Sequence, residues 1–414
     1  MNTTVTTTTN GHSHCEPTLL GSLRALPRAA WVLLAGTFIN RFGGFVVPFL
    51  TLYLTGQGYS VTAVGLAVSS YGVGHFFASL VGGHLADRLG RRETIVLSMF
   101  GAAVAMLLLS QAHALWAVVI LSFITGLVSE AYRPAATALL TDLVPPGQRL
   151  TAFAALRVTF NAGFAFGPAI AGLLAAYGYI WLFVGDAFTS AVFGLIAWLA
   201  LPRGVERATN DSANWRAVLT VLHGDKRFQQ LLLANFAVSL VFMQLASTFG
   251  LFVTGLGFSA STYGVMISLN GLLIVFCELP ITAFTRRFPA RQVMALGYTL
   301  VGAGFALNHF AHSVPALVVC MIVFTFGEML ALPMASAYVA DLAPPQMRGR
   351  YMGINGMTWA LALVLGPALG MKLFSLNPAA YWAAGAALGV MAAVVISISP
   401  TAGHNQDGGS ILKE

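Results

Sequence analysis

The chain has 414 residues, of which 57% are hydrophobic and only 8% are charged. Since an ordinary soluble domain has roughly 25% charged residues, this composition excludes a soluble globular protein and indicates a membrane protein. The net charge of +7 comes from basic residues scattered over short turns rather than from one basic surface, so we expect no nucleic-acid partner.

Twelve apolar segments are long enough to cross roughly 30 Å of hydrocarbon as helices. They span residues 29–55, 60–86, 93–112, 114–143, 150–176, 180–201, 227–255, 260–285, 292–311, 313–342, 351–375 and 379–399. We therefore predict an all-α integral membrane protein with twelve transmembrane helices. The helices form an N-terminal bundle at 29–201 and a C-terminal bundle at 227–399, joined by a cytoplasmic loop at 202–226. Residues 1–28, which lack the regions of a signal peptide, are expected to be a disordered tail, and residues 400–414 a second tail.

Basic residues mark one side of the predicted membrane protein. They precede the first segment and occupy the even-numbered connections, at Arg24, Arg28, Arg88, Arg91, Arg92, Arg149, Arg203, Arg207, Arg216, Lys226, Arg227, Arg286, Arg287, Arg291, Arg348 and Arg350. The odd-numbered connections carry none. Because short cytoplasmic loops have an excess of Lys and Arg, we predict a multi-pass protein of the cell (inner) membrane with both termini in the cytoplasm.

The two bundles are an internal repeat. A shift of 199 residues sets YLTGQGYSVTAVGLAVSSYG (53–72) on FVTGLGFSASTYGVMISLNG (252–271), and PAATALLTDLVPPGQR (134–149) on PMASAYVADLAPPQMR (333–348). The same shift sets Gly167-Pro168 on Gly366-Pro367. Parallel repeats related by an axis along the membrane normal are an architecture of secondary transporters, with the substrate near the midplane between them.

The connection after the second segment contains the most specific motif. GGHLADRLGRR (82–92) fits the pattern G-x-x-x-D-[RK]-x-G-[RK]-[RK] through Gly83, Asp87, Arg88, Gly90, Arg91 and Arg92. With these residues the chain resembles the major facilitator superfamily (MFS), from about residue 29 to 399. The resemblance implies the MFS fold and a cytoplasmic gate with a charge cluster of Asp87, Arg91 and Asp142. The alternative is a basic turn that only fixes orientation.

The second half departs from this gate pattern. TAFTRRFPARQ (282–292) has Arg286 where Asp87 would fall. A gate in this half must therefore use Asp341 with Arg287 or Arg291.

The fifth segment carries NAGFAFGPAIAGLL (161–174). It is similar to the motif of antiporting members of the superfamily through Gly163, Gly167, Pro168 and Gly172. Small residues four apart let helices approach closely, and an internal proline favours a bend. The resemblance implies an exporter. A plain packing seam is the alternative, because the eleventh segment has the related VLGPALG (364–370) through the duplication.

Charged residues within the first half suggest a substrate cavity. Asn40 and Arg41 lie in the first segment, and Glu130 and Arg133 lie on one face of the fourth because they are three residues apart. In the MFS fold, both segments line the central cavity. The surplus of positive charge could meet a polar group of the substrate. Alternatively, Glu130 is neutralised by Arg133 and Arg41 and holds helices together.

The second half contributes two carboxylates, Glu278 and Glu328. Glu278 lies about two turns from Arg286 and Arg287 and could be a gate partner. Glu328 has no evident counter-ion in the sequence, and burial disfavours the charged form of a carboxyl group. A group that is protonated in one state and ionised when water or a cation reaches it suits a proton-coupled carrier. A permanently protonated Glu328 that bonds a neighbouring helix is the alternative.

The segment GEMLALPMASAYVADL also resembles the tenth span of multidrug exporters of the LmrP type. In that group the corresponding glutamate serves proton coupling or cation binding, so the resemblance supports a coupling role for Glu328. The candidate coupling residues are therefore Glu328, Glu130 and Glu278. The candidate cavity consists of Asn40, Arg41, Glu130, Arg133 and Glu328.

Together these features predict a proton-coupled antiporter that exports lipophilic or cationic drugs or metabolites by alternating access. A second candidate is a carrier of peptides, amino acids or organic acids that uses Arg41 and Arg133. A membrane enzyme is a third class, which no catalytic motif supports; GHSHCE (11–16) has metal-binding residue types but lies in the tail. We expect a monomer in the bilayer that takes a small-molecule substrate, uses the proton gradient, and needs no cofactor or metal.

Overall fold

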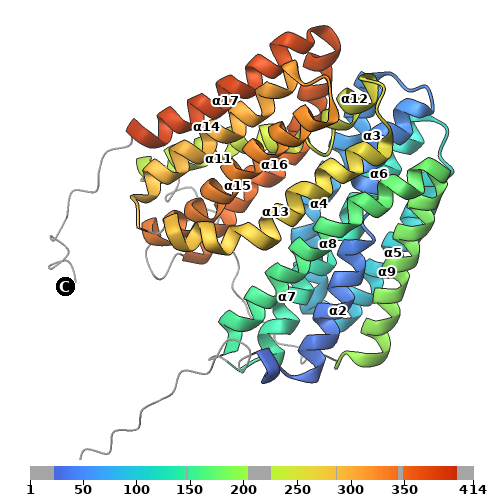
Figure 1. The fold of residues 1–414 in the computed structure, drawn as a ribbon. Helices are drawn as coiled ribbons and strands as arrows, with labels where there is room; N and C mark the ends of the chain where they lie inside the picture. The colour runs from blue at the N-terminus through green and yellow to red at the C-terminus, as the bar shows by residue number, and fades with distance from the viewer. Residues whose placement is uncertain (1–22, 146–147, 204–224, 286, 344–347, 399–414) are drawn as a thin grey trace, which may run out of the picture.

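In the computed structural model, helices make up nearly all of the part of the chain that is described, which comprises residues 23–145, 148–203, 225–285, 287–343 and 348–398 (Figure 1). The N-terminal half contains α2 (Arg28–Phe42), α3 (Val46–Gly56), α4 (Val61–Arg88), α5 (Arg91–Ser110), α6 (Leu115–Glu130), α7 (Tyr132–Leu143), α8 (Arg149–Tyr177) and α9 (Ile180–Ala200). The C-terminal half contains α11 (Lys226–Met243), α12 (Thr248–Gly255), α13 (Ala260–Thr285), α14 (Ala290–Ala306), the 3-10 turn η2 (Leu307–Phe310), α15 (Val314–Leu342), α16 (Arg348–Leu376) and α17 (Pro378–Ile398).

Some sequence predictions fall outside these ranges. They concern the tail through residue 22 with its GHSHCE stretch, the connection at 204–224 with Arg207 and Arg216, Arg286, and the C-terminal tail from residue 400.

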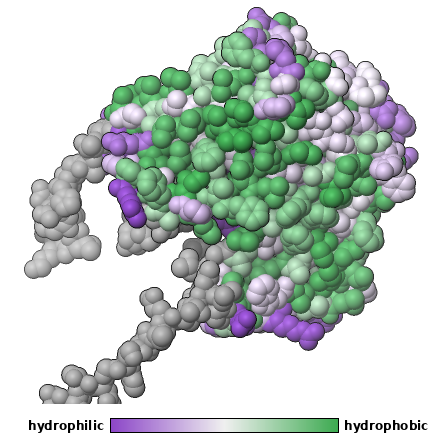
Figure 2. Space-filling view, in the orientation of Figure 1, coloured by the Kyte–Doolittle hydropathy of each residue, from purple (hydrophilic) through white to green (hydrophobic). Residues whose placement is uncertain are grey.

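Twelve helical spans in the described residues are long and apolar enough to cross a membrane. Four of them need a closer description: α2 with α3 forms the first span, α6 with α7 the fourth, α11 with α12 the seventh, and α14 with η2 the ninth. The predicted twelve-helix fold of two six-helix repeats is confirmed. Large hydrophobic side chains are exposed along the spans, and Figure 2 shows a broad hydrophobic face with hydrophilic residues gathered toward its ends. Such a surface fits contact with lipid rather than water.

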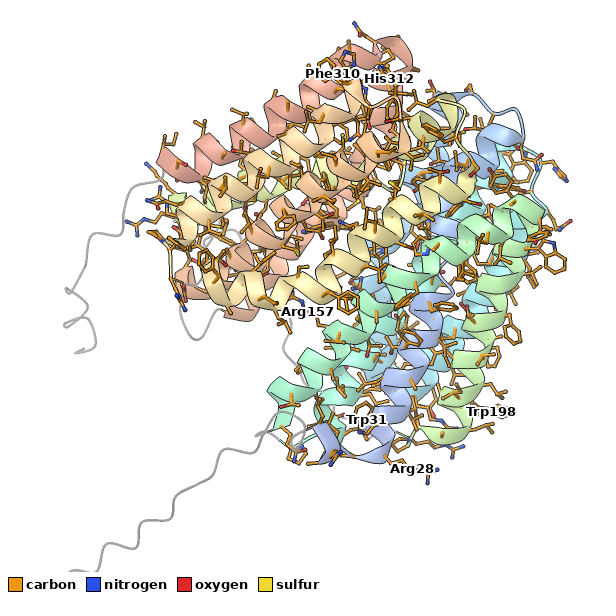
Figure 3. The ribbon with its side chains drawn as sticks, viewed as in Figure 1. Arg28, Trp31, Arg157, Trp198, Phe310 and His312 are labelled. Atoms are coloured by element: carbon orange, nitrogen blue, oxygen red, sulfur yellow. The ribbon has the colours of Figure 1, made fainter. Side chains whose placement is uncertain are left out.

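The two ends of the molecule differ. We call the end that carries Arg28 the basic end, and the opposite one, which carries Phe310 and His312, the far end (Figure 3). Arg92, bonded to the last turn of α9, and Arg291, bonded to the last turn of α17, belong to the basic end. At the far end, equivalent glycines form the turns before α4 and α13: Gly58 has a φ of 88° and Gly257 a φ of 87°. This left-handed conformation favours glycine, so both halves need glycine at this point of the turn.

The buried core shows how the halves meet. One hydrophobic cluster contains residues of both halves, including Phe49 and Val64 from the first and Phe249, Tyr263 and Met371 from the second. The other two clusters are each built within a single half. The shared cluster lies toward the far end, whereas the helices of the two halves diverge toward their basic ends in Figure 1. The structure is therefore closed at the far end and open at the basic end.

Candidate functional site

The first span is interrupted at its centre. Helix α2 ends at Phe42 and α3 begins at Val46, with Gly43 and Gly44 in between. The seventh span is interrupted two to three residues from the equivalent place, between Met243 and Thr248. Interrupted segments at matching positions in two repeats point to the binding site of a transporter.

Arg41 occupies the last turn of α2, where a cation also interacts favourably with the helix dipole. Its Nη1 and Nη2 donate to Glu130 Oε1 at 3.1 Å and Oε2 at 2.9 Å. Its Nε donates to the hydroxyl of Tyr132 at 2.9 Å. Glu130 and Tyr132 flank the break between α6 and α7, so the paired charges tie together two interrupted spans. A two-pronged arginine–carboxylate pair is among the strongest hydrogen-bonded contacts.

Arg133 adds a second positive charge to the same carboxylate. Its Nη1 lies 3.4 Å from Glu130 Oε2. The ring of Phe160 on α8 receives both guanidinium groups, Arg41 Cζ at 4.8 Å and Arg133 Cζ at 5.0 Å from its centroid. The side chain of Arg133 is 45% exposed and that of Arg41 is 23% exposed. Arg133 is therefore the more accessible member of the pair.

A cavity of about 220 Å³ adjoins this network. Its polar lining comprises Asn40, Arg41, Tyr71, His75, Ser129, Glu130, Asp186 and Ser190. The Nδ1 of His75 lies 4.0 Å from Glu130 Oε1, and the Asn40 amide donates to Ser190 Oγ at 3.2 Å. The structure thus brings together the predicted residues Asn40, Arg41, Glu130 and Arg133.

Asp186 on α9 lies beside the interrupted first span. Its carboxylate is only 4% exposed and accepts a hydrogen bond from the backbone N–H of Val46 at 3.3 Å. Val46 is the first residue of α3, and a carboxylate is stabilised at a helix N-terminus. Asp186 therefore helps to hold the break in place.

Glu328 lies in the second half, on α15, and is 9% exposed. Its Oε2 accepts a hydrogen bond from the side-chain amide of Asn270 on α13 at 2.7 Å. The same amide donates to Thr325 Oγ1 at 3.0 Å. Within the described residues, no Lys, Arg or His forms an ion pair with Glu328. It is therefore a buried carboxyl group held by an amide, apart from the charge network of the first half.

Glu278 pairs with Arg157 rather than with the arginines that follow it in sequence. The pair joins α13 of one half to α8 of the other, and Arg157 lies where these two helices diverge (Figure 3). The sequence shows that both residues lie within apolar spans, but the repeat gives no signal that the two halves would meet there.

The motif at the basic end is only partly assembled. Gly90 has a φ of 100°, which fits the predicted tight turn, and Arg91 forms an ion pair with Asp142. Asp87 is exposed, and no hydrogen bond or ion pair of its side chain occurs in the part of the chain that the structure describes. Arg88 is exposed, and a Cβ added at Gly83 would meet nothing within 4 Å. Because the two halves are apart at the basic end, these residues do not pack against the other half.

Arg92 and Arg291 do not reach across the halves. Arg92 donates to the carbonyl oxygens of Ala197, at 3.3 Å, and Trp198 at the end of α9. Arg291 donates to the corresponding oxygens of α17, Ile396 at 2.9 Å and Ser397 at 2.8 Å. Both arginines thus donate to carbonyls in the last turn of a helix, where few of the carbonyls have partners within the helix. The Ala197 oxygen also accepts from the Leu201 N–H, at 3.2 Å.

In this open state, Arg92 donates within its own half, and Arg291 donates to α17. The gate predicted from Asp341 with Arg287 or Arg291 stays a prediction for the closed basic end. Asp341 is exposed. Arg287, the other predicted partner, is exposed too.

The glycines of the fifth span face two different neighbours. A Cβ added at Gly163 would lie 2.6 Å from Arg41 Cβ, and one at Gly167 would lie 2.6 Å from the Phe42 carbonyl oxygen. A Cβ at Gly172 would instead lie 2.8 Å from Ser261 Cα of the other half. The motif therefore fits α8 against the interrupted first span as well as against α13. Pro168 lies within α8.

Two parallel six-helix repeats around buried charges define the architecture of a secondary transporter. The sequence profile of the Major Facilitator Superfamily matches residues 33–273 and 231–410. The chain belongs to this superfamily.

Relatives support the same class. The chain is 28% identical over 349 residues to the uncharacterized MFS-type transporter YqjV of Bacillus subtilis (strain 168), covering 82% of this chain and 85% of that protein. It is 27% identical to the multidrug resistance protein MdtH of Enterobacter sp. (strain 638), with 83% and 86% covered. It is 25% identical to a Na(+), Li(+), K(+)/H(+) antiporter of Planococcus maritimus, with 82% and 88% covered.

Solved structures share the fold. The nucleoside transporter NupG superposes with a TM-score of 0.75 at 18% identity, covering 90% of this chain and 98% of that one. A POT family transporter in complex with 5-aminolevulinic acid gives 0.73 at 17% identity, with 90% and 95% covered. At these identities the likeness concerns the fold alone.

Proposed function

We propose that this protein is a proton-coupled antiporter of the cell (inner) membrane that exports lipophilic or cationic small molecules by alternating access. The observation that carries the proposal is the environment of Glu328. A buried carboxylate without a cation is very costly, and such a group is stable chiefly in its neutral form. Entry of water or of a cationic substrate would favour the ionised form, so proton release and substrate binding are linked.

The environment of Glu130 argues against the same role for that residue. Arg41 and Arg133 both contact its carboxylate, and opposite charges at this distance stabilise the ionised form. Glu130 therefore remains charged throughout the cycle and holds the interrupted spans together. Glu278, which has one cationic partner in Arg157, is an intermediate case.

The basic end is proposed to face the cytoplasm, because cytoplasmic loops are rich in Lys and Arg. Both termini then lie on the cytoplasmic side. The open basic end corresponds to the state that admits cargo from the cell, and the closed far end to a sealed outer face. The names of two relatives, a multidrug resistance protein and a cation/proton antiporter, support export of drug-like or cationic cargo.

The test is proton movement driven by substrate in proteoliposomes, with a pH-sensitive dye inside and a panel of lipophilic cations, peptides and organic acids outside. We expect lipophilic cations to drive proton flux in the wild type and Glu328→Gln to abolish it. Glu328→Asp, which keeps a carboxyl group, should retain part of the flux, and Glu278→Gln serves as a control at a second carboxyl group in the same half. Flux that survives Glu328→Gln would contradict the assignment, and loss of flux in Glu278→Gln would then move the coupling site to Glu278.

A carrier of peptides, amino acids or organic acids is the second candidate. The exposed side of Arg133 beside Phe160 favours it, because a guanidinium group binds carboxylates with matching geometry. The solved POT family transporter, which shares the fold, is in complex with 5-aminolevulinic acid. Arg133→Gln distinguishes the two candidates. Selective loss of transport for anionic or zwitterionic compounds would favour this candidate. If lipophilic cations are the only compounds transported and the variant still transports them, the first candidate is favoured.

A further inference from the structure

Two equivalent hydrogen bonds join the halves near the far end. The backbone N–H of Ala169 on α8 donates to Ser268 Oγ on α13 at 2.8 Å. The backbone N–H of Ala368 on α16 donates to Ser69 Oγ on α4 at 3.1 Å. Each bond runs from one half to the other, and the shift of 199 residues turns one into the other. We call the two bonds the serine clasp.

A proline directly precedes each donor and weakens the backbone hydrogen bonding of its helix at that point. Ala169 follows Pro168, and Ala368 follows Pro367, both inside long helices. A proline within a helix removes one backbone hydrogen bond and displaces the carbonyl one turn before it. In membrane helices, backbone groups freed in this way are satisfied by serine or threonine side chains of neighbouring helices.

Glycine creates the space that the serines need. Gly264 lies one turn before Ser268, and a Cβ there would lie 2.2 Å from the Pro168 carbonyl oxygen. Gly65 lies one turn before Ser69, and a Cβ there would lie 3.2 Å from Ala368 Cα. The repeat has thus kept the glycine and the serine of each bond together.

The position of the clasp relates it to the closed end. Each of its four residues lies eight residues from the far end of its helix: Ser69 from Val61, Ser268 from Ala260, Ala169 from Tyr177 and Ala368 from Leu376. At 1.5 Å per residue this is about 12 Å of helix. Neighbouring Val68 and Ile267 belong to the core cluster that both halves share.

The same helices are apart at the basic end. A Cβ added at Gly83 of α4, or at Gly353 or Gly356 of α16, would meet no atom within 4 Å among the described residues. Contact between α4 and α16 therefore occurs toward the far end and is lost toward the basic end. Reversing this arrangement, as alternating access requires, would separate the clasp.

We propose that the serine clasp sets the balance between the two states of the transport cycle by holding the far end closed. When the far end opens, water in the new cavity takes over the bonds of both hydroxyl groups and both N–H groups. Ser69 and Ser268 are positioning residues, since they act through the relative placement of the halves. The proposal rests on the transporter class of the protein and not on the identity of its cargo.

Distances between spin labels, measured by double electron–electron resonance, test the proposal without any substrate. One label pair is placed at the far end, on Gln57 and Leu376, and another at the basic end, on Leu89 and Met352, all of which are exposed. The background lacks the native cysteines. In the variant with both Ser69→Ala and Ser268→Ala, the far-end distance should lengthen and the basic-end distance should shorten together.

The expected size follows from hydrogen bonds measured in membrane proteins. The ratio of far-end-open to far-end-closed molecules should rise roughly threefold for each serine removed and roughly tenfold for both. Serine to threonine at both positions keeps the hydroxyl groups and should leave the ratio near that of the wild type.

Ser70→Ala is the matched control. Ser70 is the neighbour of Ser69, but its hydroxyl donates to the Val119 carbonyl at 2.8 Å within the N-terminal half. Its loss should leave the ratio unchanged. Unchanged distances in the double variant would overturn the proposal, as would an equal shift in Ser70→Ala. Broadening of both distances with a lower unfolding temperature, but without the reciprocal shift, would also overturn it and assign the serines to ordinary packing.

Discussion

In the N-terminal half, the buried carboxylate of Glu130 is surrounded by Arg41, Arg133 and His75, whereas in the C-terminal half the buried Glu328 is held by the amide of Asn270. Both carboxylates lie in equivalent spans of one duplicated bundle, one residue apart under the repeat. The two halves therefore offer the same scaffold with opposite electrostatics: a fixed, paired charge in one and an unpaired acid in the other.

The repeat shows which residues belong to the scaffold. Under the shift of 199, the charged or titratable members of the first-half network correspond to apolar residues: Arg41 to Leu240, His75 to Ile274, Glu130 to Met329 and Arg133 to Leu332. The packing and capping residues are of the same type in both halves: Gly65 and Gly264, Ser69 and Ser268, Arg92 and Arg291, and Pro168 and Pro367. Duplication has preserved what closes and supports the fold, while the polar chemistry has become different in each half.

The same substitution in the two halves gives the sharpest test of this difference. Glu130→Gln would leave Arg41 and Arg133 without their carboxylate, and breaking a buried ion pair costs about 3–5 kcal/mol. Under the proposed function Glu328 is uncharged, so Glu328→Gln replaces one neutral hydrogen-bonded group with another of the same shape and should cost less than about 1 kcal/mol. Thermal unfolding in detergent measures both. Equal losses of stability would break the proposed contrast between a structural and a coupling carboxylate.

The hydroxyl of Tyr132 provides the next largest expected effect. Tyr132→Phe removes the acceptor of the Arg41 Nε hydrogen bond, and a hydrogen bond to a charged group contributes about 1.5–3 kcal/mol. We expect a clearly lower unfolding temperature than that of the wild type. The control is Tyr298→Phe in the other half, which removes a neutral hydrogen bond of Tyr298 to Asn235 and should cost only about 1 kcal/mol. A larger loss for Tyr298→Phe would contradict the central role given to the first-half network.

Gly163→Ala tests whether the fifth span positions Arg41. The added Cβ would lie 2.6 Å from Arg41 Cβ, and overpacking of this kind costs about 1–3 kcal/mol. Gly83→Ala is the matched control, because its Cβ would meet nothing within 4 Å and alanine is the better helix former. We expect reduced thermal stability for the first and unchanged or slightly increased stability for the second. Similar effects would show that the glycine motif has no special relation to Arg41.

Sequence reasoning predicted the fold because its signals are local or periodic. Span length, basic turns and the repeat each follow from the order of residues alone, and the structure has the twelve helices. The sequence leaves open whether Glu130 is paired by Arg41 and Arg133 or the cavity charges meet the substrate; in the structure Glu130 contacts both arginines. The Arg91–Asp142 pair, which the resemblance implied, is present.

The contacts that the sequence did not predict depend on how each helix is rotated about its axis and on which conformation the protein adopts. His75, Tyr132 and Asn270 were missed because a single polar residue in a span does not reveal which neighbour it faces; the one available hint was that Tyr71 and His75 are one turn apart and share a face. Ser69 and Ser268 fall at equivalent places in the two repeat segments 53–72 and 252–271. Their partners are backbone groups, which leave no trace in side-chain identity. Asp87 lies at the open basic end, where the two halves are apart, so its place in a closed gate stays a prediction.

The smallest expected effect concerns two arginines that occupy equivalent positions in the halves. For this pair we expect equal losses of stability instead of different ones. Arg92 and Arg291 bind the last carbonyls of α9 and α17 in the same way. Losing a cation at a helix C-terminus costs about 0.3–1 kcal/mol. Arg92→Ala and Arg291→Ala should therefore lower stability by similar small amounts and increase hydrogen exchange in the last turn of α9 or α17 only. If Arg92→Ala alone impaired proton-driven transport while stability stayed unchanged, Arg92 would act in the gate that its motif implies, and the scaffold would differ between the halves at this position.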